Sequence, residues 1–185
     1  MNREIMLAVL KQSIPVLIVA MLLGIAAGQI LNLSESLILV PWVLFMIPII
    51  NGIGGNLGSV VGARLASALH MGSISTKLEG VELERNIMTG LALGITTYLS
   101  LALFSIALAP ALGLEINVEI WRFAAVMMLA GVLLTFVVLA TSMVSALYSF
   151  KLGLDPDNVV APLTASSGDI AGILCLIMSL TVVGI

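Results

Sequence analysis

Apolar residues in this chain fall into long runs, and nearly all charged residues stand between these runs. Four runs contain no Asp, Glu, Lys or Arg, and a fifth contains only Asp169; they cover residues 12–34, 36–63, 86–114, 123–150 and 158–185. About 20 apolar residues suffice for a helix to cross a bilayer. The pattern predicts an all-α membrane protein with five transmembrane helices, at about residues 12–34, 36–68, 86–110, 122–149 and 158–184.

The composition supports a membrane protein. It excludes a soluble domain and argues against a nucleic-acid-binding protein. Of the 185 residues, 61% are hydrophobic and 9% are charged, whereas a soluble domain carries about 25% charged residues. The net charge of −3 offers no basic surface for nucleic acid. We expect residues 1–185 to form a single transmembrane domain in the lipid bilayer, as a multi-pass protein of the cell (plasma) membrane.

The first apolar run has one alternative interpretation, a cleaved signal peptide. Arg3 and Lys11 would form its basic region, and Ala26-Ala27-Gly28 would lie near a small-residue cleavage site. The run is long for a signal peptide, and four further spans follow it. These two features favour a retained first helix.

The basic residues predict the orientation, because short loops rich in Lys and Arg stay in the cytoplasm. A cytoplasmic N-terminus places six basic residues inside and only Arg122 outside, and the C-terminus then lies outside. Glu35, Glu115 and Glu119 fall on the outer side, where they would attract cations or serve as solvated loop residues. The six inner residues are Arg3, Lys11, Arg64, Lys77, Arg85 and Lys151.

Asp169 is the residue that membrane insertion tolerates least. It lies ten residues past Val159, or roughly 15 Å into the bilayer. An ionised carboxylate there costs at least about 2.5 to 3.5 kcal/mol, and no Lys or Arg lies at matching depth in another span. The missing partner is therefore a mobile ion, or else Asp169 is protonated or hydrogen-bonded and holds helices together.

The helical neighbours of Asp169 are small or weakly polar. Ala165 and Ser166 lie one turn before it, and Gly172 lies one turn after it. Gly168 and Gly172 form a pair that allows close helix approach. The hydroxyl groups near Asp169 are either ligands for an ion or donors of hydrogen bonds to carbonyls of their own helix.

The second run is rich in residues that weaken a helix. It contains Pro41 and Pro48, followed by Asn51-Gly52-Ile53-Gly54-Gly55-Asn56-Leu57-Gly58. We expect freed backbone carbonyls around residues 51–56 and an Asn56 side chain directed into a pathway. Gly54, Gly58 and Gly62 also repeat every four residues, which predicts tight helix packing.

These groups suggest a particular ligand chemistry. Carboxylate, amide and carbonyl oxygens suit Mg²⁺, with Mn²⁺ or Ca²⁺ as alternatives. One Asp cannot neutralise a divalent ion, but a twofold homodimer would supply two carboxylates and two Asn56 amides. The candidate metal ligands are Asp169, Asn56, Ala165, Ser166 and Asn51.

Two motifs resemble one known family. The segment from Ile50 to Gly58, continuing to Arg64-Leu65, resembles the glycine-asparagine signature in the second span of MgtE magnesium transporters and their eukaryotic solute-carrier relatives. The segment Asp155-Pro156-Asp157-Asn158, then Pro162 and Gly168-Asp169, resembles the approach to their last span. The two motifs occur in the family's order.

The resemblance implies a dimeric pore formed by the second and fifth spans, with Asp169 coordinating hydrated Mg²⁺ and Asn56 near that ion. Two features depart from the family. Bacterial members carry cytoplasmic regulatory domains and a Gln shortly after the motif, whereas this chain has Val60 there and begins at its first span. Eukaryotic relatives fuse two such units, whereas this chain has one, which agrees with dimerisation.

The leading functional hypothesis is transport of a divalent cation, Mg²⁺ first, through a pore at a homodimer interface. One alternative is a non-transporting assembly subunit whose glycine faces bind partner helices. A second is an intramembrane aspartyl protease, suggested by Gly168-Asp169. That chemistry needs two carboxylates, and the chain has no second intramembrane acid, so we expect no enzyme activity.

Overall fold

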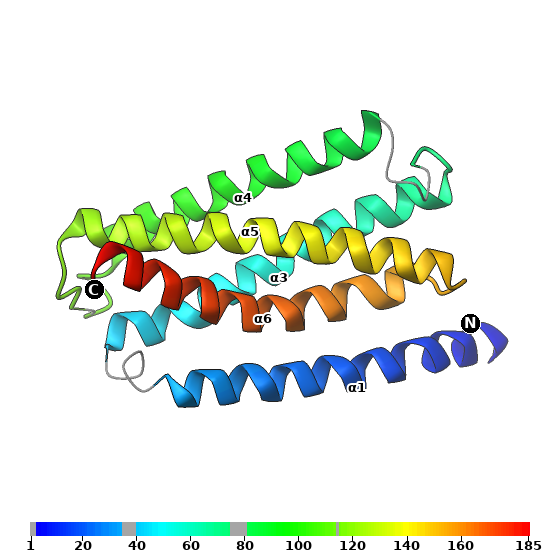
Figure 1. Cartoon of the computed structure of the whole chain (residues 1–185), viewed down its shortest axis with the longest axis horizontal. Coiled ribbons are helices and arrows are strands. Elements are labelled where there is room, and N and C mark those ends of the chain that lie inside the picture. The colour runs from blue at the N-terminus through cyan, green and yellow to red at the C-terminus, as the bar shows by residue number, and fades with distance from the viewer. Residues whose placement is uncertain (1–2, 35–39, 75–80, 114) are drawn as a thin grey trace.

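The computed structural model describes residues 3–34, 40–74, 81–113 and 115–185. Within these ranges the chain folds into long helices that lie side by side along one axis (Figure 1). All of them are long and apolar enough to cross a membrane, as predicted. They are α1 (Arg3–Leu33), α3 (Pro41–His70), α4 (Val81–Leu108), α5 (Ile120–Lys151) and α6 (Pro156–Val183).

Four helices begin before their predicted spans, α5 and α6 by two residues and the other two by more. α1 begins at Arg3 rather than at residue 12, and α4 begins at Val81 rather than at residue 86. The charged residues in these first turns mark where the apolar run starts, but a helix continues through them because its backbone hydrogen bonds do not depend on lipid. Glu35 and Lys77, assigned to loops by the sequence, lie outside the described residues.

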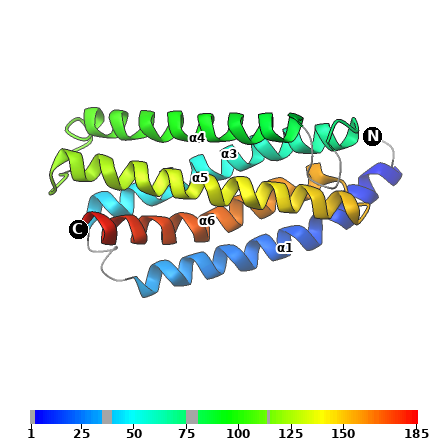
Figure 2. The same ribbon diagram turned by 45° about the horizontal axis from the view of Figure 1, so that its top comes forward.

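Helix α6 packs against α5, α3 and α1, and α3 also packs against α5. α4 packs against α5 and α3. Figure 2 shows α1 and α4 at opposite edges of the bundle, with the other three helices between them. Most apolar side chains of α1 are exposed in the single chain, so this helix presents a broad surface to lipid or to another protein.

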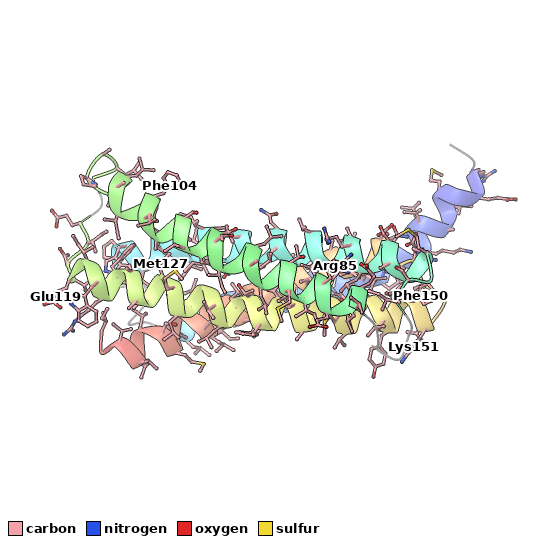
Figure 3. All side chains as sticks on the ribbon, turned by 90° about the horizontal axis from the view of Figure 1, so that it is seen from above. Arg85, Phe104, Glu119, Met127, Phe150 and Lys151 are labelled. Atoms are coloured by element: carbon pink, nitrogen blue, oxygen red, sulfur yellow. The ribbon has the colours of Figure 1, made fainter. Side chains whose placement is uncertain are left out.

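Consecutive helices run in opposite directions, so their ends form two groups. We call the end that carries Arg3, Arg64, Arg85 and Lys151 the inner end, because the sequence predicts it to be cytoplasmic. Figure 3 shows Arg85 and Lys151 toward this end and Glu119 at the opposite, outer end. The orientation relative to the two sides of a membrane remains a prediction.

The start and stop of α6 follow from local chemistry. Asp155 precedes the helix, and its carboxylate accepts a hydrogen bond of 3.1 Å from the backbone N–H of Asp157. Pro156 occupies the first helical position, where its missing N–H costs nothing. Gly184 ends the helix in the left-handed conformation, with φ of 79°. Asp155 is therefore the N-cap of α6.

The expected break in the second span is wrong. α3 is one continuous helix from Pro41 to His70, with Pro48 inside it. The backbone around residues 51–56 is therefore hydrogen-bonded within the helix rather than freed. The glycines serve instead as contact points for neighbouring helices, which was the second interpretation of their four-residue spacing.

Candidate ion-binding site

The contact between α3 and α6, which we call the central seam, depends on glycines of α3. A Cβ atom added to Gly55 would lie 3.4 Å from the Cβ of Ala165. Cβ atoms at Gly58 and Gly62 would overlap with Thr164 and Val160. As residue numbers rise along α3 they fall along α6, so the two helices are antiparallel. Only glycine permits this approach of the two backbones.

Asp169 lies at the middle of α6 on the central seam. Thirteen residues of the helix precede it and fourteen follow it, so it is about 20 Å from each end. Its side chain is partly exposed. The ion pairs formed by the described residues do not include Asp169. A carboxylate at mid-membrane depth without a basic partner in the described chain is the arrangement expected of a cation ligand.

Asn51 joins α3 to Asp169. Its side-chain Nδ2 donates a hydrogen bond of 3.2 Å to the backbone carbonyl of Asp169. Its Oδ1 is buried and has no hydrogen-bond partner among the described residues. A buried unpaired oxygen is costly, so this atom is a candidate acceptor for water or a hydrated ion.

Gly172 makes room for Asn51. A Cβ atom at Gly172 would overlap with Asn51 Oδ1. By contrast, a Cβ atom at Gly168 would meet its nearest neighbour, Val138 Cγ2, at an ordinary 3.7 Å. Gly168 and Gly172 therefore differ in role, and the missing side chain of Gly172 leaves space for the side-chain amide of Asn51.

Ala165 and Ser166 occupy the turn of α6 before Asp169. Ala165 packs against Gly55, and Ser166 is partly exposed. The hydroxyl of the next residue, Ser167, donates to the Leu163 carbonyl at 2.7 Å. Back-bonding therefore accounts for Ser167, whereas Ala165 and Ser166 remain beside the carboxylate at helical spacing.

Asn56 lies apart from these residues. Five residues along a helix turn the chain by about 140°, so Asn56 faces away from Asn51. It is exposed and lines a groove of about 230 Å³ with Ile53 and Val60 of α3 and Leu93 and Thr97 of α4. Within one chain, the structure brings Asn51, Ala165 and Asp169 together, but Asn56 opens onto a different face.

A polar cluster at the inner end was not predicted as a group. Gln12 Oε1 accepts hydrogen bonds from the Asp155 backbone N–H at 3.1 Å and from Asn158 Nδ2 at 3.2 Å. His70 Nε2 lies 3.7 Å from Asp155 Oδ1. Gln12 carried no signal in the sequence because a single amide inside an apolar run does not reveal its partner.

The residues described here contain no group of three or more Asp, Glu, His or Cys side chains that could enclose a metal ion. A site built on the central seam would therefore use few protein oxygens and leave water on the ion. Mg²⁺ binds in this manner because it loses its water reluctantly.

The fold and the partly exposed carboxylate at the middle of α6 define a helical membrane protein with a polar centre. The family model described as MgtE, divalent cation transporter, matches residues 47–179. This match covers more than half of the chain, and the chain belongs to that family. It is a multi-pass membrane protein of a transporter family and not an enzyme, so the protease alternative is excluded.

One curated relative extends the comparison. Solute carrier family 41 member 2 of Xenopus laevis is 27% identical over 173 residues, which cover 88% of this chain and 31% of the relative. The chain therefore spans about a third of the length of that protein. The resemblance inferred from the two motifs is confirmed.

Proposed function

We propose that this protein transports Mg²⁺ across the cell membrane through a pore at a homodimer interface. In this proposal a hydrated ion is held by Asp169, with Asn51, Ala165 and Ser166 beside it. The observation that carries the proposal is the position of Asp169, which is partly exposed at the middle of α6 and outside every ion pair of the described residues.

A second chain supports the charge balance of this proposal. One carboxylate leaves a divalent ion with excess positive charge, whereas two carboxylates related by a twofold axis neutralise it. Asn56 enters the proposal through the same dimer. Because it faces away from Asp169 within its own chain, it would contact the ion path at another level or from the partner subunit.

Flux into liposomes tests the proposal. Asp169→Asn keeps the shape of the side chain but removes its charge, so we expect Mg²⁺ entry to fall at least about a hundredfold. The protein is reconstituted in vesicles that contain a Mg²⁺-sensitive dye, and the change in dye fluorescence measures Mg²⁺ entry. Size and thermal unfolding of the variant in detergent establish that it is folded and assembled.

Asp157→Asn is the matched control. Asp157 belongs to the same helix and is exposed at its inner end, so the same substitution there should leave flux within about twofold of wild type. The proposal is wrong if folded Asp169→Asn transports at the wild-type rate. Replacing Mg²⁺ by Mn²⁺ or Ca²⁺ outside the vesicles ranks the three ions by their rates of entry.

A non-transporting assembly subunit makes the opposite prediction. Its isolated form would carry no ion at all, and Asp169→Asn would alter its association with partner helices instead. The flux of the wild-type protein alone therefore separates the two functions.

A further inference from the structure

The inner end of the α3–α4 contact contains a hollow with an arginine fixed at its edge. The hollow has a volume of about 350 Å³ and is lined mainly by Ala63, Arg64, Ser67, Met71, Glu82 and Asn86. It lies at the opposite face of α3 from the α6 contact. The Mg²⁺ proposal does not use it.

Arg64 is held by a buried amide. Its Nε donates a hydrogen bond of 2.8 Å to Asn86 Oδ1. Asn86 is only 5% exposed, and its Nδ2 donates in turn to the Glu82 carbonyl at 2.8 Å. Because Asn86 has its own fixed partner, it holds the plane of the guanidinium in one orientation.

The bond through Nε leaves the two terminal nitrogens of Arg64 available. They make no hydrogen bond with the residues that the structure describes, and the side chain is exposed. A guanidinium presents its terminal N–H groups as a planar fork that matches the oxygens of a phosphate. An arginine oriented in this way is prepared to bind such a group.

The one acidic side chain of the hollow does not occupy this fork. Glu82 Oε1 pairs instead with Arg85 Nη1 at 2.8 Å. Because Arg85 pairs with Glu82, Arg64 is the charged residue of the lining that has no ionic partner among the described residues. An anion fits this balance, whereas a metal cation does not.

The depth of the hollow favours a lipid as the source of the anion. Arg64 lies six residues before the end of α3 at His70, or about 9 Å along the helix. Because the 30 residues of α3 exceed the roughly 20 that cross the hydrocarbon core, we expect Arg64 near the membrane interface. The thioether side chain of Met71 is 75% exposed at the rim and would contact an acyl chain. Anionic lipids also concentrate near basic residues at such an end.

We propose that Arg64, oriented by Asn86, forms a binding site for a phosphate group at the inner end of α3 and α4. An anionic lipid headgroup or soluble phosphate could supply this group, and the geometry of the hollow is the same for both. The site is independent of the ion site on the central seam.

Native mass spectrometry of the purified full chain tests the site, with EDTA present so that no metal bridges the partners. The probes are dioleoyl phosphatidylglycerol, dioleoyl phosphatidylcholine and inorganic phosphate, each titrated separately. We expect the wild type to prefer phosphatidylglycerol and R64Q to lose at least about tenfold in affinity for it. Arg64-dependent binding of inorganic phosphate without lipid selectivity would assign the same site to the soluble anion.

Two further variants make the result decisive. Lys151→Gln removes the same charge at the same end but outside the hollow, so it should bind the lipid within about twofold of wild type. Ser67→Phe fills the hollow while leaving Arg64 and Asn86 in place, so it should lose binding as R64Q does. Wild-type affinity in folded R64Q, or an equal loss in K151Q, would overturn the proposal.

Discussion

The contact between α4 and α5 and the central seam between α3 and α6 are built alike but differ in their polar groups. In both, glycines of one helix receive side chains of the other: Tyr98 packs on Gly131 between α4 and α5, as Thr164 packs on Gly58 in the central seam. At the α4–α5 contact, Tyr98 donates to the Ile50 carbonyl at 3.0 Å and Thr135 donates to the Gly131 carbonyl at 2.8 Å. These hydroxyl groups are therefore satisfied within the protein.

The central seam leaves polar groups available. Asn51 Oδ1 is buried without a described partner, and Asp169 stands outside the ion pairs of the described residues. Glycine packing explains why both contacts are close, but it does not explain this difference. Under the proposed function, the α4–α5 contact serves stability alone, whereas the central seam would also hold the ion.

The largest expected loss of stability comes from overfilling the α4–α5 contact. Any side chain at Gly131 would overlap with the Tyr98 ring, so Gly131→Leu should destabilise the protein by about 3 kcal/mol or more. Thermal unfolding in detergent measures this effect. Gly24→Leu is the matched control, because a Cβ atom there has no neighbour within 4 Å, and an equal loss in that variant would contradict the assignment.

An intermediate effect, on transport rather than stability, is expected at Gly172. Gly172→Ala would displace the Asn51 amide from its place beside Asp169, so Mg²⁺ flux should fall at least about tenfold. Gly168→Ala, whose Cβ meets Val138 at 3.7 Å, should retain most of its flux. Equal Mg²⁺ flux in the two variants would contradict the proposed role of Asn51 beside Asp169.

The smallest effect is expected at Tyr98. Tyr98→Phe removes one hydrogen bond to the Ile50 carbonyl and should cost about 1 kcal/mol of stability, with flux unchanged in folded protein. Tyr148→Phe, at an exposed position of α5, should cost nothing measurable in the same unfolding experiment. A large loss of flux in folded Tyr98→Phe would show that the two contacts do not differ as described.

The sequence was sufficient to predict the long apolar helices and the place of Asp169 near the middle of the last one, because both follow from where charges fall along the chain. It could not show whether the backbone of residues 51–56 is helical or unwound. Proline and glycine weaken an isolated helix, but α3 remains helical since its neighbours pack into the glycine positions. That packing depends on α5 and α6, which no local pattern describes.

The sequence also could not show which of the two asparagines, Asn51 or Asn56, contacts Asp169. The motif drew attention to Asn56, whereas the residue that contacts Asp169 in the same chain is Asn51. Helical geometry alone places them on different faces, but only the position of α6 identifies which face meets the carboxylate. Arg64 and Asn86 illustrate the same limit, because they lie on different helices.

The central claim is that the Asp169 carboxylates of two chains hold one hydrated divalent ion. Anomalous scattering from crystals of the protein grown with Mn²⁺, as a substitute for Mg²⁺, tests it most directly. We expect one peak on the twofold axis, near both Asp169 side chains and absent from crystals of Asp169→Asn. A dimer with both carboxylates facing lipid and no peak between them would contradict the account.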